Sequence, residues 1–217
     1  GNDNAYMEIK LEKCRPLAKN AGSIGTLSSY YTDLGLVFFN LQEFEKSAAY
    51  CQQAIDLLNE NGIEDWNLLW AYLNLAHTRI LQKEMEQARG ILLKAEALLQ
   101  PVFEREGKYT SFPFYHLLQS LYHELEGELN KAIDHALKGI EYAERYRLGY
   151  HHFRLMYYLA HYYEQVNRNE ESKEILESIK QTDGYTNMIE NQSVVLNKLA
   201  EVEAKGGNHE EAYRTMR

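Results

Sequence analysis

Cysteine and proline are scarce in this sequence, and each shortage limits what the chain can be. Only two of its 217 residues are cysteine, and Cys14 and Cys51 form neither a CxxC pair nor a disulfide framework. Both lie on apolar helical stripes, where a single cysteine is typically a small core residue. A reducing compartment is therefore favoured. Because the chain has three prolines in total, long stretches contain nothing that interrupts a helix.

Long apolar runs and an excess of basic residues are also missing. No run of about 18 apolar residues occurs, so a membrane-spanning helix is not expected. Lys and Arg total 23 against 32 Asp and Glu, and the basic residues are scattered along a chain of net charge −9. Such a surface repels phosphate backbones and anionic lipid, which excludes nucleic acid and membrane insertion. We expect a cytoplasmic location, or a periplasmic one if a leader preceding Gly1 has been removed.

Motifs that carry chemistry are missing as well. The sequence contains no Ser or Cys nucleophile motif, no glycine-rich phosphate loop and no HExxH. Two histidines can share a metal when they lie three or four residues apart on one helix face. His151 and His152 are adjacent and diverge, while His116 and His123 are two turns apart. We therefore expect no catalytic residue, no metal site and no cofactor in this segment.

An internal repeat is the strongest positive signal. Gly35 is followed by Ser47 twelve residues later and by Ala54 nineteen residues later, and similar small residues recur at these offsets further along the chain. Small residues allow two helices to approach to about 8–10 Å. The first small residues of the units, called anchors below, are Gly35, Ala76, Ser120, Ala160 and Ala200, spaced by 41, 44, 40 and 40 residues.

The repeat predicts an all-α solenoid of antiparallel helix pairs. Within each unit a short polar break separates two long amphipathic segments, at 40–43, 82–84, 126–128, 167–169 and 206–208. Residues 1–22 are predicted to be the second helix of a truncated repeat within a single domain at 1–217. The abrupt ends predict a fragment of a longer chain. The five units are predicted at 25–60, 65–101, 111–146, 150–181 and 187–217, and the second helix of the last unit is expected to be cut short.

The first unit resembles the tetratricopeptide repeat through Tyr31, Leu34, Gly35, Phe38, Phe44, Ser47 and Ala54. The third and fourth units depart from the pattern at Gln119 and Ile179. The long period is similar to tetratricopeptide regions of bacterial signalling proteins, including those with GGDEF domains, and of peptide-responsive regulators. The resemblance implies a right-handed superhelix whose first helices line a concave groove for peptides or partner helices.

The aromatic stretch HHFRLMYYLAHYYEQ at 151–165 is the first helix of the fourth unit on this grid. Met156, Leu159, Ala160 and Tyr163 take packing positions, which leaves a second stripe for the groove. For Trp70, Leu73, Phe114 and Leu117, the alternative is that the array's own flanking helices cover them. The groove residues that the resemblance implies are Asn40, Trp70, Leu73, His77, Phe114, Leu117, Leu121, Arg154, Tyr157, His161 and Asn197.

These observations favour a non-catalytic module that binds a protein or peptide. The resemblance implies the sensory part of a bacterial signalling protein, for example one with a GGDEF or kinase output domain. One alternative is a receptor for a peptide pheromone, which would hold the peptide backbone with asparagines such as Asn40 and Asn197. Another alternative is a self-associating adaptor, which would form a homodimer.

Overall fold

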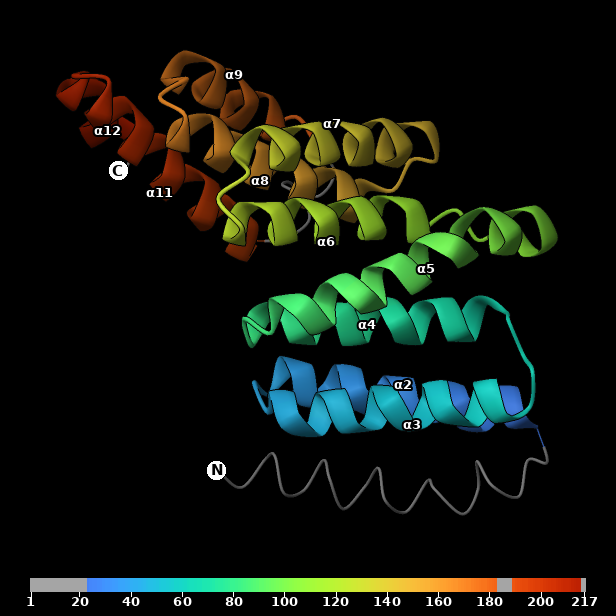
Figure 1. The fold of residues 1–217 in the computed structure, drawn as a ribbon. Helices are drawn as coiled ribbons and strands as arrows, with labels where there is room; N and C mark the ends of the chain where they lie inside the picture. Colours follow the sequence, from blue (N-terminus) through green and yellow to red (C-terminus); the bar gives the residue numbers. More distant parts are fainter. Residues whose placement is uncertain (1–22, 183–188, 216–217) are drawn as a thin grey trace. The chain divides into compact units, whose positions relative to one another are not determined.

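The computed structural model describes residues 23–182 and 189–215, and every regular element in these ranges is a helix (Figure 1). The predicted all-α fold class is confirmed. The predicted half repeat at 1–22 lies outside the described residues. The helices are α2 (Ile24–Asn40), α3 (Phe44–Glu60), α4 (Trp66–Leu81), α5 (Met85–Glu106), α6 (Ser111–Leu125), α7 (Leu129–Arg145), α8 (Gly149–Gln165), α9 (Asn169–Ile179), α11 (Ile189–Lys205) and α12 (His209–Thr215).

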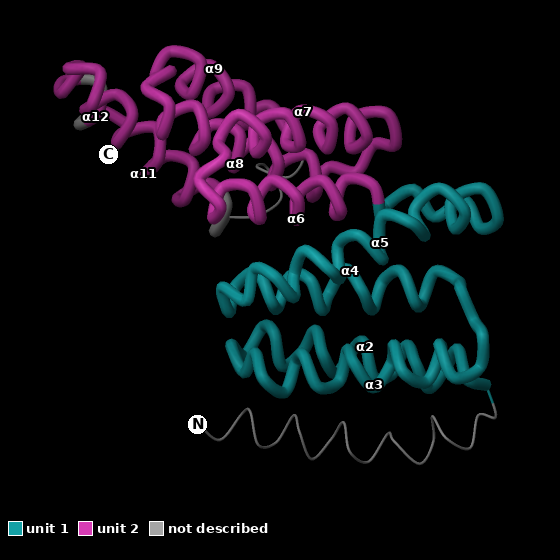
Figure 2. The backbone as a smooth tube through the Cα atoms, in the orientation of Figure 1, with its two compact units in different colours: residues 1–111 teal, residues 112–217 magenta. Residues whose placement is uncertain are grey.

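The described helices form two compact units, with the boundary between residues 111 and 112 (Figure 2). Each of these compact units contains more than one of the repeats read from the sequence, and 'unit' has this larger meaning from here on. In the first unit α2 packs on α3, α3 on α4, and α4 on α5. In the second unit α7 packs on α8, α8 on α9, α9 on α11, and α11 on α12. Within each unit these helices contact the described helices that come next to them in the chain, which is the contact pattern of a helical repeat.

The helix boundaries follow local chemistry. Asp65 begins α4, because its carboxylate accepts hydrogen bonds from the backbone N–H groups of Asn67 at 2.9 Å and Leu68 at 3.2 Å. The helix α5 continues past the predicted boundary at residue 101, because Pro101 is accommodated inside it. It ends instead at Gly107, which has a φ of 64° and donates its N–H to the carbonyl of Phe103.

One turn geometry is repeated between the paired helices. The residue seven positions after each anchor has a positive φ, and the next residue donates its N–H to a carbonyl five residues back. In the first repeat Glu43 donates to Phe38 and Gln42 donates to Phe39, which is the Schellman arrangement for satisfying the last carbonyls of a helix. The residues with positive φ in these turns are Gln42, Lys83, Gly127, Asn167 and Gly207.

The small anchor residues lie where paired helices touch. A Cβ on Gly35 would lie 2.5 Å from Sγ of Cys51 on α3 and 3.2 Å from the carbonyl oxygen of Ser47. In the fourth repeat Ala160 is fully buried, and its carbonyl accepts a hydrogen bond of 2.8 Å from the Ser172 hydroxyl on α9. At these two anchors the grid read from the sequence marks positions where paired helices are in close contact.

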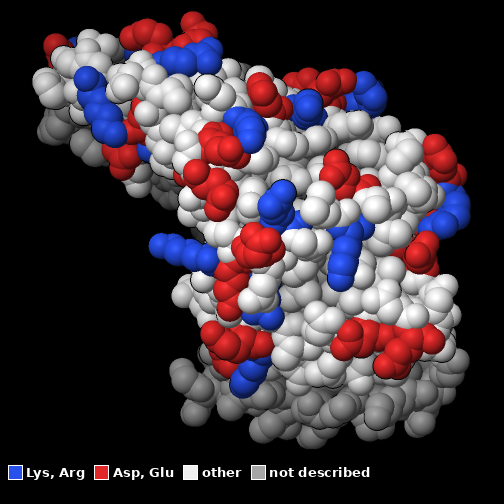
Figure 3. Space-filling model, viewed as in Figure 1, with Lys and Arg blue, Asp and Glu red and all other residues white. Residues whose placement is uncertain are grey.

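The surface has mixed charge. On the face shown in Figure 3, Lys and Arg lie among Asp and Glu and do not form one basic patch. Among the described residues, no helix combines the length and the apolar composition that crossing a bilayer requires.

Candidate functional site

A hollow of about 370 Å³ lies between α8 and α11 in the second unit, and we call it the α8–α11 hollow. Three of the residues predicted for the groove meet there. They are Tyr157 and His161 on α8 and Asn197 on α11. Sequence reasoning missed Tyr158 and Lys198 as groove residues. The complete lining is Tyr157, Tyr158, His161, Val194, Asn197, Lys198 and Glu201.

The two helices that form the hollow are positioned by an apolar core. Met156 and Ala160 on α8 pack with Val195 and Leu199 on α11, and Leu176 on α9 belongs to the same cluster. Burial of this face leaves the adjacent stripe of α8 to form one wall of the hollow. Tyr157 packs against the edge of the cluster, so its ring belongs partly to the core and partly to the hollow.

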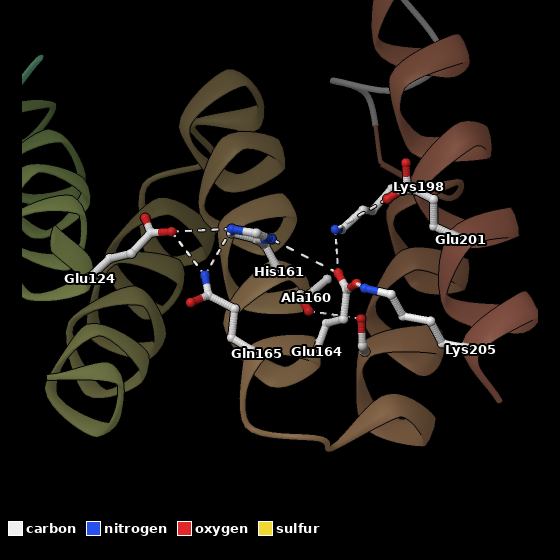
Figure 4. A network of polar contacts seen from close by, with 9 residues as sticks. Glu124, Ala160, His161, Glu164, Gln165, Lys198, Glu201 and Lys205 are labelled. Atoms are coloured by element: carbon white, nitrogen blue, oxygen red, sulfur yellow. Dashed lines mark hydrogen bonds and ion pairs between the residues drawn. The ribbon is translucent and has the colours of Figure 1, made fainter. Parts of the chain in front are cut away.

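A charge network includes His161, Lys198 and Glu201 of the hollow's lining (Figure 4). The Glu164 carboxylate is 6% exposed and forms ion pairs with Lys198 and Lys205 of α11. Lys198 is itself 11% exposed, and its ammonium lies 3.5 Å from the carboxylate of Glu201. Burial raises the pKa of Glu164, but hydrogen bonds from Lys198 and Lys205 outweigh it and hold the pKa below its ordinary value. Glu164 therefore carries a charge at neutral pH and links α8 to α11.

His161 extends the network to α6. Its Nε2 lies 3.1 Å from the carboxylate of Glu124, and its Nδ1 lies 3.9 Å from that of Glu164. Gln165 donates a second hydrogen bond of 2.9 Å to Glu124. Burial raises the pKa of Glu124, whereas the hydrogen bonds from His161 and Gln165 lower it more, so the net shift is downward. The imidazole is therefore held in a fixed orientation at one end of the hollow.

The lining is suited to noncovalent recognition. The rings of Tyr157 and Tyr158 lie edge to face with centroids 6.0 Å apart. Burial raises the pKa of Tyr157, so its phenol stays protonated and can donate or accept a hydrogen bond. The amide of Asn197 has two donors and one acceptor oxygen, and Val194 adds an exposed apolar surface. Such a mixture matches the polar backbone and apolar side chains of a peptide.

The residues that were predicted for the groove in the first and second repeats lie outside the hollow and differ in their solvent exposure. Leu73 is fully buried and His77 is 9% exposed. The other residues from Ala71 to Thr78 on α4 are buried as well. A helix buried on all sides has no stripe left for a partner. Trp70 is half-buried and stacks on Trp66 with centroids 5.1 Å apart, while Asn40 is exposed at the end of α2.

On α6, Leu117 is fully buried, and Phe114 and Leu121 are 5% and 7% exposed. Burial of these residues and of Leu73 favours the alternative that the chain's own helices cover them. A partner contact through them stays a prediction. Arg154 is half-buried on α8, and its guanidinium lies over the ring of Tyr150 at 5.6 Å, outside the lining of the hollow.

One family model matches the sequence. Residues 25–100 match the model of the tetratricopeptide repeat. No curated protein matches the sequence. The matched residues cover the two repeats of the first unit described above, where the small residues and aromatic positions follow the family pattern most closely.

Solved structures of helical repeat proteins are similar to the whole chain. BtubC from P. vanneervenii has a TM-score of 0.73 at 15% identity, over 98% of this chain and 86% of its own. The Rap conjugation gene regulator of plasmid pLS20, solved with the Phr* peptide, has a TM-score of 0.70 at 13% identity, over 88% of this chain and 52% of its own. A STAND signal-transduction ATPase from Pyrococcus horikoshii with a tetratricopeptide repeat sensor has a TM-score of 0.68 at 16% identity, over 97% of this chain and 33% of its own. These likenesses show the fold, which is a helical repeat solenoid.

Proposed function

We propose that this chain, which carries tetratricopeptide repeats at residues 25–100, is a non-catalytic module that binds a peptide or a protein segment in the α8–α11 hollow. The observation that carries the proposal is the meeting of Tyr157, His161 and Asn197 in one hollow, from helices of two successive repeats. Its volume of about 370 Å³ lies within the range of about 300–1,000 Å³ that is usual for ligand sites.

The walls of the hollow are fixed before any partner binds. The Glu164 carboxylate links α8 to α11 through Lys198, and His161 is held by Glu124 from α6. A ligand therefore does not have to order these side chains when it binds, which lowers the entropy cost of association. Support for a peptide as the ligand comes from the tyrosine hydroxyls and the asparagine amide, which can pair with peptide N–H and carbonyl groups.

A peptide-responsive regulator is the second candidate. The Rap regulator of similar fold was solved with the Phr* peptide, and a further Rap protein of similar fold was solved with the competence and sporulation factor. In this chain Asn197 lines the hollow, where it could hold a peptide backbone. A competing proposal is self-association through the same surface, and light scattering on the purified chain distinguishes the two by molar mass.

The place of the module in a larger protein is a separate proposal. The long repeats resemble those of bacterial signalling proteins, so we assign the chain a sensory role with a GGDEF or kinase output domain. Sequencing the native reading frame at and after the codon of Arg217 tests this assignment. An output domain in that frame supports it, and a frame that ends after another helix or two favours the adaptor.

Selection from a displayed peptide library tests binding directly. We expect the purified chain to enrich peptides whose affinity falls at least tenfold in Tyr157→Ala and in Asn197→Ala. Tyr150→Ala is the matched control, because Tyr150 is on the same helix, is 52% exposed and lies outside the hollow. Equal affinity of the Tyr157→Ala and Tyr150→Ala variants for the enriched peptides would overturn the proposal.

A further inference from the structure

The charged groups beside the α8–α11 hollow form one line of contacts, which Figure 4 shows from end to end. On one side of Glu164, His161 lies 3.9 Å from that carboxylate and 3.1 Å from the carboxylate of Glu124. On the other side, Lys198 pairs with Glu164 and lies 3.5 Å from the carboxylate of Glu201. Carboxylates therefore stand at both ends of the line and at its centre.

The positive charges near the hollow are already paired with Glu164. Lys198 and Lys205 each form an ion pair with that carboxylate, one with each of its two oxygens. Because Glu164 is 6% exposed and Lys198 is 11% exposed, an acidic ligand could reach the Lys198 ammonium only by displacing a buried carboxylate. Lys205 lies outside the lining of the hollow. The hollow is therefore poorly suited to an acidic group.

Glu201 provides an accessible negative charge in the lining. Its side chain is 61% exposed, and the contact of 3.5 Å with Lys198 is made by its Oε2 atom, so Oε1 can accept a hydrogen bond from a ligand. Glu201 follows Asn197 by four residues on α11, which places the two on one helix face about 6 Å apart along the axis. A peptide held at Asn197 can therefore extend a long side chain to Glu201.

Aromatic rings accompany this carboxylate. Tyr157 and Tyr158 line the same hollow as Glu201, and the two rings lie edge to face. The faces of aromatic rings attract ammonium and guanidinium ions, and carboxylates pair with the same ions. The combination of two tyrosines with an exposed glutamate is therefore suited to a positively charged side chain.

The net charge of the chain acts in the same direction. The sequence has 32 acidic and 23 basic residues, which gives a net charge of −9. A negative field of this kind raises the rate at which positively charged partners associate. The field attracts any basic segment, whereas the lining of the hollow determines where its side chain is held.

We propose that the α8–α11 hollow selects peptides or protein segments that place a basic side chain, lysine or arginine, against Glu201 and the rings of Tyr157 and Tyr158. This inference rests on the function proposed above and adds the class of ligand. Asn197 pairs with the peptide backbone, Glu201 pairs with the charged head of the side chain, and the tyrosine rings cover its aliphatic stem. Glu201 is then the residue that determines specificity.

Parallel selections from one displayed library of random peptides test the proposal. The native chain and Glu201→Gln serve as baits, and a peptide is assigned to the hollow when its affinity falls at least tenfold in Tyr157→Ala. We expect Lys and Arg to be enriched among the assigned peptides of the native chain and not among those of Glu201→Gln. Glu141→Gln is the matched control, because it removes one exposed negative charge outside the hollow and should retain the enrichment.

Substitutions in both partners locate the contact. Citrulline in place of arginine, or norleucine in place of lysine, removes the charge of a selected peptide and keeps the length of its side chain. We expect this change to weaken binding to the native chain at least tenfold and to have less than a twofold effect on binding to Glu201→Gln. An equal effect in both chains would overturn the assignment to Glu201. Because Glu201 is exposed, its substitution should leave the fold intact, which circular dichroism checks.

The outcomes separate this proposal from the function on which it rests. Neutral or acidic peptides that bind through Tyr157, without enrichment of Lys or Arg, would overturn the ligand class and leave peptide binding intact. Failure to select any peptide that depends on Tyr157 would overturn both.

Discussion

Gly35 and Cys51 touch so closely that the first carbon of any side chain on Gly35 would lie 2.5 Å from the Cys51 sulfur. Cys51 is fully buried. The backbone carbonyl of Ser47, 3.2 Å from the same point, closes the other side. The first helix pair therefore depends on glycine for its separation.

Gly35→Leu is expected to lower the free energy of unfolding by about 1–3 kcal/mol, because overpacking forces α2 away from α3. Chemical denaturation measures the change. Gly90→Leu is the matched control, since nothing lies within 4 Å of a Cβ at Gly90 on α5, and replacing a helical glycine there should stabilise the chain by up to about 1 kcal/mol. Equal stability of the Gly35→Leu variant and the native chain would mean that the anchor is misplaced.

The repeated turn gives a second prediction. Lys83 has a φ of 61°, a conformation that costs a residue with a side chain about 1–2 kcal/mol. Lys83→Gly removes that cost and adds the smaller entropy cost of glycine, so we expect a gain of about 0.5–1 kcal/mol in the free energy of unfolding. Glu86→Gly, inside α5, is the contrasting variant and should lose about 1 kcal/mol. A loss in both variants would contradict the turn geometry.

The small residues and the turns explain why the fold could be predicted. Gly35 and Ala160 can be recognised in the sequence because close helix contacts exclude larger side chains, and this constraint is local. The solvent exposure of the stripe assigned to the groove was harder to predict, because the burial of a residue depends on every neighbouring helix. Leu73 lies on a stripe that is open in an isolated helix pair, yet it is fully buried here. Lys198 was missed because its position depends on how α11 rotates against α8.

Half-buried histidines of the third repeat, His116 on α6 and His135 on α7, predict a pH dependence. His116 and His135 have pKa values of about 3 and 4 in the folded chain, against 6.5 for an ordinary histidine. Below pH 6.5 the unfolded chain binds protons that the folded chain does not, so the free energy of unfolding falls as the pH falls. The loss begins near pH 6.5 and continues to about pH 3–4. For His116 the limiting slope is about 1.4 kcal/mol per pH unit.

Urea denaturation between pH 7.5 and 5.5 measures this slope in a range above the titration of most carboxylates. His116→Gln should flatten the slope, because it removes the histidine whose pKa burial lowers to about 3. A slope that is unchanged in His116→Gln would show that His116 is not held neutral in the folded chain.

The Glu164 carboxylate is predicted to connect stability with ligand binding. Glu164→Gln removes the negative charge between Lys198 and Lys205, and Lys198 is too buried for water to replace it fully. We expect a loss of about 1–3 kcal/mol in the free energy of unfolding, as is usual when one partner of a buried hydrogen-bonded pair is removed.

The same substitution should weaken peptides selected for the α8–α11 hollow, because α11 loses its ionic link to α8. Glu141→Gln serves as the control for both measurements, since Glu141 and Arg145 form an exposed pair on α7 and such pairs contribute little. Loss of stability with unchanged peptide affinity would separate the network from the hollow, and binding would then depend on the tyrosines and Asn197 alone.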